Sequence, residues 1–171
     1  MKLTKNNTIT ATVLCLIILG TAVTVATAGA ASDRNPNNSR AYLHSYNLNS
    51  TGLAIEGYCP VTYFTDNKAV PGNPGLTATH NGVDYRFASQ SAKRAFESNP
   101  QRYIPAYGGW CAFGMAVQDK FPVDPTNFKI VDGRLMLFLR NVNVDARERW
   151  NQGDEASQVE SADSHWKQVS G

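Results

Sequence analysis

Cysteine is scarce in this chain: three occur among 171 residues, alongside three histidines and three methionines. Cys15 lies in an apolar leader, so the folded part of the chain keeps two thiols, Cys59 and Cys111. No two cysteines or histidines stand close together in the sequence. This spacing gives little support to a zinc site or to a redox-active CxxC pair.

An excess of charge of either sign is also missing. With Lys2 and Lys5 of the leader set aside, 14 basic residues face 14 acidic ones, and no run of lysine or arginine remains. The sequence therefore lacks the electrostatic footprint of a nucleic-acid-binding protein. The GxSxG, HExxH and P-loop patterns are absent, and the acidic residues are dispersed, so we expect a non-catalytic protein.

What the chain does have at its start is the pattern of an export signal over residues 1–30. Lys2 and Lys5 precede an apolar core, and no further charge occurs before Asp33. Small residues at 26, 28 and 30 offer two cleavage sites. We predict an exported protein, periplasmic or secreted, without stable membrane association after the signal is removed. An uncleaved membrane anchor is the alternative, because the uncharged stretch is long enough to span.

The rest of the chain divides into three parts. Residues 31–52 are polar and rich in asparagine, which predicts a flexible lead-in. Residues 53–166 form the ordered domain, and residues 167–171 form a C-terminal tail. One domain is the expectation for this length, and 42% hydrophobic residues are enough for a core.

Two hairpins are predicted inside the ordered domain. Asn81-Gly82 and Asp132-Gly133 are both preferred two-residue turns, and each is flanked by strand-like segments. The apolar segment 134–139 indicates a central strand. Helices are predicted after Ser89, from 142 to 150 and from 154 to 166. The fold class is therefore α+β, a small antiparallel sheet built from two hairpins and packed with several short helices. We expect no internal repeat.

The chemistry of the two remaining thiols stays open at this stage. A Cys59–Cys111 disulfide would close a loop of about fifty residues and contribute ~4 kcal/mol in the chain-entropy model. Alternatively, Cys111 and Met115 share a helix face, and with Cys59 and a histidine such as His80 they form a donor set that suits copper(I). A third possibility is a redox protein or thiol enzyme that uses Cys111.

Five segments resemble the YHS domain, and the last two resemble its exported, stand-alone form. They occur in the family's order, at residues 57–64, 80–89, 96–103, 107–112 and 130–135. The resemblance covers about residues 53–166. It implies a small α+β domain that is often joined to copper-transporting ATPases and other metal-handling proteins, with metal binding as the usual role.

The chain also departs from the metal-handling members of that family. Ala88 and Ala92 stand at about the places where those members carry cysteine, and Cys59 replaces a frequent aspartate. The resemblance carries metal binding to this chain only through Cys59 and Cys111. We predict a non-catalytic, exported domain that binds a soft metal, copper above all, or meets a metal-handling partner. The alternative is a structural or protein-interaction domain.

Overall fold

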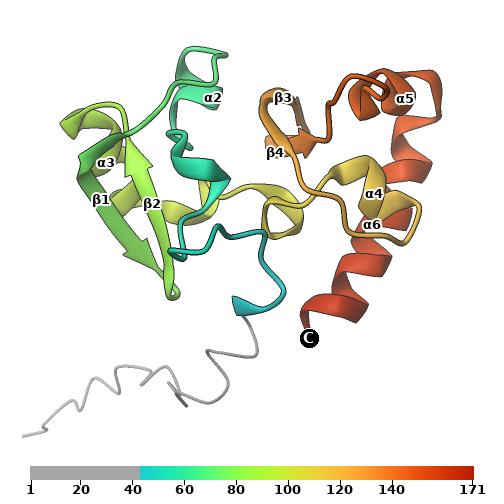
Figure 1. Cartoon of the computed structure of the whole chain (residues 1–171), viewed down its shortest axis with the longest axis horizontal. Coiled ribbons are helices and arrows are strands. Elements are labelled where there is room, and N and C mark those ends of the chain that lie inside the picture. Colours follow the sequence, from blue (N-terminus) through green and yellow to red (C-terminus); the bar gives the residue numbers. More distant parts are fainter. Residues whose placement is uncertain (1–42) are drawn as a thin grey trace, which may run out of the picture. The chain divides into compact units, whose positions relative to one another are not determined.

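The computed structural model describes residues 43–171, drawn in colour in Figure 1. The predicted signal peptide, residues 1–30, and the first part of the predicted lead-in lie outside the described residues. Within residues 43–171, no helix has the length and apolar character needed to cross a bilayer. In chain order the elements are η1 (Ile55–Gly57), α2 (Thr62–Thr65), β1 (Asn73–His80), β2 (Val83–Phe87), α3 (Gln90–Ser98), η2 (Pro100–Arg102), η3 (Ala106–Gly109), α4 (Ala112–Ala116), β3 (Asp124–Val131), β4 (Arg134–Phe138), α5 (Ala146–Gln152) and α6 (Glu155–Ser170).

The first hairpin forms where the Asn81-Gly82 pair predicts it. β1 and β2 pair antiparallel, and the two turn residues have φ of 50° and 80°. Left-handed backbone at both positions is what a type I′ turn requires. Val83, Tyr85 and Phe87 alternate as the buried side of β2, which confirms the predicted face and the place of Tyr85 in the core.

The second hairpin is confirmed in the same way. Asp132 and Gly133 have φ of 49° and 73°, and they join β3 to β4. The α+β class is therefore confirmed, with two antiparallel hairpins and short helices (Figure 1). The hairpins form two separate two-stranded sheets, where one sheet was expected.

Strand β4 is buried although a two-stranded sheet has no central strand. Its free edge is covered by single parallel bridges from Pro105 to Leu135 and from Cys111 to Leu137. The segment 105–111 therefore stands in for a third strand. This contact explains why β4 has the apolar sequence that predicted a central position.

The two hairpins repeat one plan, which corrects the expectation of no internal repeat. In the first hairpin, successive paired residues on β1 jump from Asn73 to Thr77. In the second hairpin, successive paired residues on β3 jump from Asp124 to Phe128. In each case the partner strand advances by one residue. The same irregularity thus recurs at equivalent places, 51 positions apart.

The backbone that leads into each hairpin is repeated as well. Residues 55–57 have φ of 52°, 50° and 87°, and residues 107–109 have φ of 56°, 59° and 86°. Three consecutive left-handed residues are uncommon, because L-residues with a side chain pay for positive φ. We therefore define a first unit, residues 53–87, and a second unit, residues 105–138. A parallel bridge closes each one, Leu53 to Asp84 and Pro105 to Leu135.

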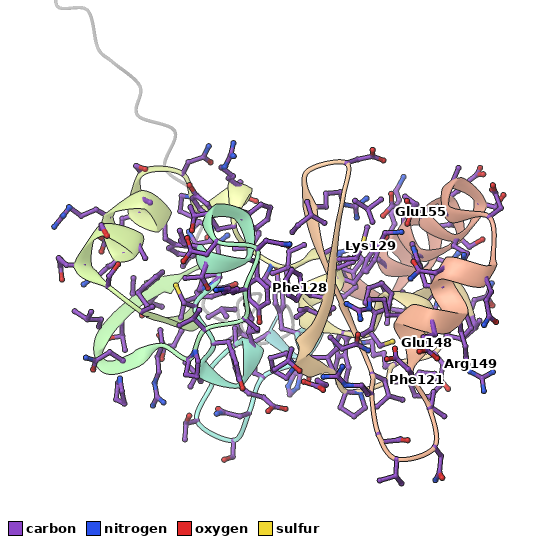
Figure 2. All side chains as sticks on the ribbon, turned by 90° about the horizontal axis from the view of Figure 1, so that it is seen from above. Phe121, Phe128, Lys129, Glu148, Arg149 and Glu155 are labelled. Carbon is purple, nitrogen blue, oxygen red and sulfur yellow. The ribbon has the colours of Figure 1, made fainter. Side chains whose placement is uncertain are left out.

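One hydrophobic core serves both units. It includes fully buried residues from the first unit, such as Phe87, and from the second, such as Phe138. Helix α6 packs against α4, and α5 contributes the fully buried Trp150. The start of α6 is held to β3, because Glu155 pairs with Lys129, and both are labelled in Figure 2. Glu155 also accepts a hydrogen bond from Trp150 Nε1 at 2.8 Å.

The chain just before the first unit is packed, which corrects the expectation of a flexible lead-in for residues 43–52. Ser45 is buried, its carbonyl accepts from Trp110 Nε1 at 2.6 Å, and its hydroxyl donates to Val169 O at 3.1 Å. Asn47 donates to both Gly108 O and Gly109 O. Polar composition alone suggested flexibility, whereas these residues bond the second unit and α6 through their backbone and side chains.

Two helix boundaries also differ from those predicted. α5 begins after Asp145, whose side chain caps it, because the Asn141 side chain holds residues 143 and 144 in a turn. α6 continues through Ser170, so the predicted tail is helical for all but its last residue. The predicted cap at Ser89 is confirmed, since its hydroxyl accepts from Ala92 N at 3.1 Å.

Candidate functional site

Cys111 stands at the N-terminus of α4. Its sulfur accepts from Gly114 N at 3.5 Å, and its carbonyl accepts from Met115 N at 2.9 Å. The predicted single helical turn from Cys111 to Met115 is thus confirmed. Both side chains are 0% exposed.

The surroundings of Cys111 favour the protonated thiol. Burial raises its pKa, and backbone N–H groups of Leu139, Gly114 and Phe113 offset only part of that rise. Reactive cysteines need a lowered pKa, because the thiolate is the nucleophile. This environment suits a packed thiol better than an attacking one.

Cys59 has the same backbone setting in the first unit. It follows the left-handed residues 55–57 by two positions, as Cys111 follows residues 107–109. Its N–H donates to Val70 O at 2.8 Å, and the N–H of Cys111 donates to Phe121 O at 3.1 Å. The two cysteines are therefore equivalent positions of the two units.

The two thiols share no hydrogen-bond partner among the described residues, and both are free. Cys59 O accepts from Thr62 Oγ1 at 3.1 Å within its own unit. Each cysteine thus belongs locally to the turn and helix of its own unit.

His80 has a different environment from both cysteines. Its Nε2 lies 3.2 Å from Asn81 Nδ2 and 3.4 Å from Gln101 Nε2, and its ring meets Phe96 edge to face at 6.2 Å. The described contacts of His80 are thus with two amide side chains and one aromatic ring. Within residues 43–171, no three His, Cys, Asp or Glu side chains are placed to hold a metal ion together.

A cavity that sequence reasoning missed lies at η3. It has a volume of about 310 Å³ and opens between η3, the β3–β4 turn and α6. Its lining comprises Tyr46, Gln101, Arg102, Ile104, Pro105, Ala106, Tyr107, Gly108, Gly133, Arg134 and Trp166. These residues span most of the described chain, so no local motif could have revealed them.

Gly108 is the point at which distant segments meet beside this cavity. It has φ of 59°, and a Cβ placed there would lie 2.8 Å from Trp166 Cη2 and 3.2 Å from Tyr46 Cα. The Tyr46 and Trp166 rings meet edge to face, with centroids 6.0 Å apart. Glycine at this position therefore lets Tyr46 and α6 close onto η3.

The side chains of Tyr107 and Arg134 form the polar part of the cavity wall. Arg134 makes a two-pronged ion pair with Asp163, at 2.9 and 2.7 Å, and its Cζ lies 5.2 Å from the centroid of the Tyr107 ring. Tyr107 is 2% exposed, and its hydroxyl lies beside Arg134 and Asp163 without a hydrogen bond of normal geometry to either of them.

Comparisons with family models, with curated proteins and with solved structures found no match.

Proposed function

We propose that this chain is an exported, YHS-like domain that works by binding and not by catalysis, and that its two thiols serve the core. The supporting observation is the equivalence of Cys59 and Cys111. Each is 0% exposed, and each donates its N–H to the carbonyl of a residue just before the hairpin of its unit. Core packing explains why a cysteine, which behaves as a small apolar side chain, occupies the same backbone position in both units.

The state of Cys111 supports the same proposal. A thiol enzyme keeps its cysteine ionised and accessible, whereas burial raises the pKa of Cys111. The histidine nearest to the first hairpin turn, His80, interacts with Asn81 and Gln101. The binding site of the chain then lies at its surface and not at the sulfurs.

Thiol labelling tests this proposal. The exported protein, purified without reductant, is treated with an aromatic disulfide reagent in buffer and in guanidinium chloride. We expect slow labelling of the folded protein and two thiols per chain after unfolding. Rapid labelling of the folded protein would contradict the proposal, and so would the appearance of thiols only after reduction.

Soft-metal binding is the second candidate, and one observation favours it. Cys111 and Met115 offer two sulfurs from a single helical turn, both inside the core. An anaerobic copper(I) titration distinguishes the candidates. One tightly bound equivalent that is lost in both Cys111→Ser and Met115→Leu would favour the metal candidate and a metal-handling partner. The leading proposal expects no stoichiometric uptake.

A further inference from the structure

We propose that the cavity at η3 binds a small organic anion, with an aromatic carboxylate as the chemical class. The inference rests on the proposed binding function, since it names the ligand class of a domain whose thiols are not the site. The cavity volume of about 310 Å³ falls at the lower end of ligand pockets, which is roughly 300–1,000 Å³. A ligand of one ring with a short acidic group suits that volume.

The charge of the lining favours an anion. Arg102 and Arg134 both line the cavity, and no acidic side chain does. Two guanidinium nitrogens of Arg134 are engaged by Asp163, while Arg102 is exposed and makes no ion pair in residues 43–171. A guanidinium presents a planar fork of donors that matches a carboxylate.

Tyr107 supplies a buried donor that has no hydrogen bond of normal geometry, although the Asp163 carboxylate lies near it. Burial raises the pKa of this phenol, so it carries its proton at neutral pH. Nearly all buried polar side-chain atoms in folded proteins have a hydrogen-bond partner, and an exception needs an explanation. A carboxylate oxygen brought in by a ligand would be that partner.

The remaining walls favour a flat apolar body on the ligand. Tyr46 and Trp166 line the cavity with their rings set at 85° to each other, and Ile104 and Pro105 add aliphatic surface. Aromatic ligands pack well against rings in edge or offset contacts. The wall therefore suits a ring better than a bare inorganic ion.

The first unit serves as an internal comparison. At the places of Tyr107 and Arg134 it has Ile55 and Val83, which are 3% and 1% exposed. The same backbone thus folds with apolar residues there. The polar pair of the second unit is not a requirement of the fold, and this points to a separate role.

The two units also differ in how that place is closed. A Cβ placed on Gly82 would lie 3.6 Å from the side chain of Leu43, whereas nothing lies within 4 Å of the equivalent position on Gly133. Leu43 therefore covers the first unit's turn, and the second unit's turn is left open beside Arg134.

A benzoate titration of the exported protein, followed by NMR, tests the inference. We expect saturable shifts of the Trp166 indole N–H with benzoate. Benzyl alcohol has the same ring without the charge, and it should bind at least roughly five-fold more weakly, because it forms no charge-assisted hydrogen bond. Inorganic phosphate and acetate should each give smaller effects. Equal binding of benzoate and benzyl alcohol, or no saturable binding of benzoate, would overturn the proposal.

Substitutions then assign the contacts. Arg102→Gln and Tyr107→Phe should each weaken benzoate binding roughly three- to ten-fold, as expected for the net loss of one hydrogen bond. Arg94→Gln is the matched control, an exposed arginine on α3 outside the cavity. Benzoate affinity that is unchanged in both cavity variants would overturn the proposal. Thiol labelling of the same samples distinguishes this failure from a failure of the proposed function.

Discussion

The Tyr63 ring meets the Phe128 ring edge to face, with centroids 4.8 Å apart and planes at 77°. Tyr63 lies on α2 of the first unit, and Phe128, which is labelled in Figure 2, lies on β3 of the second. The Tyr63 hydroxyl also donates to Pro125 O at 2.9 Å, inside the irregular part of the second ladder. A helix of one unit is thus bonded to the strand irregularity of the other.

This contact predicts that Tyr63→Phe lowers the free energy of unfolding by about 0.5–1.5 kcal/mol, because a buried hydrogen bond is lost. Denaturant unfolding measures the difference. Tyr107→Phe is the matched control, since it removes a buried hydroxyl that has no hydrogen bond of normal geometry, and we expect its effect to stay within about 0.5 kcal/mol. Equal losses in the two variants would contradict this assignment.

The left-handed turns predict a second pair of results. Gly133→Val should destabilise the domain by roughly 1–2 kcal/mol, because Gly133 has φ of 73° and a β-branched residue is strained there. No atom crowds the position, so the loss reports backbone strain alone. Gly133→Asn should recover most of the stability, since asparagine tolerates positive φ. A melting temperature that is unchanged in the valine variant would show that the strain is absent.

Substitutions at Gly108 and at the equivalent position of the first unit, Glu56, should differ in their effect on stability. Gly108→Ala should cost more than about 2 kcal/mol, because left-handed strain adds to a clash with Trp166. Glu56 has φ of 50° and is exposed, so Glu56→Gly relieves strain and should change stability by less than about 1 kcal/mol. Thermal unfolding of both variants checks this. A mild effect at Gly108 would mean that α6 does not close on η3.

Because of the Arg134–Asp163 ion pair, we expect the free energy of unfolding to depend on pH in the acid range. Burial acts to raise the pKa of Asp163, but the hydrogen bonds from Arg134, together with the nearby Tyr107 hydroxyl and the positive charge of Arg134, outweigh it and hold the pKa below its usual range. The pair therefore contributes fully above the unfolded pKa of about 3.9 and is lost as the pH falls through the lower folded pKa. The side chains are 38% and 46% exposed, so the contribution is below about 1 kcal/mol.

The measurement is the free energy of unfolding against pH for the unchanged chain and for Asp163→Asn. The variant should lose less stability between about pH 4 and pH 2. Glu160→Gln, on the exposed side of the same helix, is the control and should follow the unchanged chain. Parallel curves for the chain and for Asp163→Asn would refute the prediction.

Much of the local structure could be predicted from the sequence, because its signals are local. The Asn81-Gly82 and Asp132-Gly133 turns, the cap at Ser89 and the turn from Cys111 to Met115 depend on neighbours within a few residues. The helix predicted over residues 142–150 starts too early. The Asn141 side chain holds the residues after it in a turn, so α5 begins at Ala146.

The repeat was missed because the two units share few side chains. A glycine, an aromatic residue and a cysteine recur at residues 57–59 and 109–111, and an acid or amide before proline recurs at Asn73 and Asp124. Spacings of 51 and 52 link these matches and would have revealed the repeat. The cavity was missed for another reason: Tyr46, Tyr107 and Trp166 meet only through the fold.

The chain uses one backbone plan twice. A segment of about 35 residues is too small to bury a core by itself, so each copy depends on the other for folding. Because both copies use the same backbone, the side chain at a position in one copy can be compared with the side chain at the same position in the other. The comparison shows which side chains that backbone tolerates. Tyr107 and Arg134 vary in this sense, and Cys59 and Cys111 do not. The chain thus carries its own reference for separating residues required for architecture from residues free to specialise.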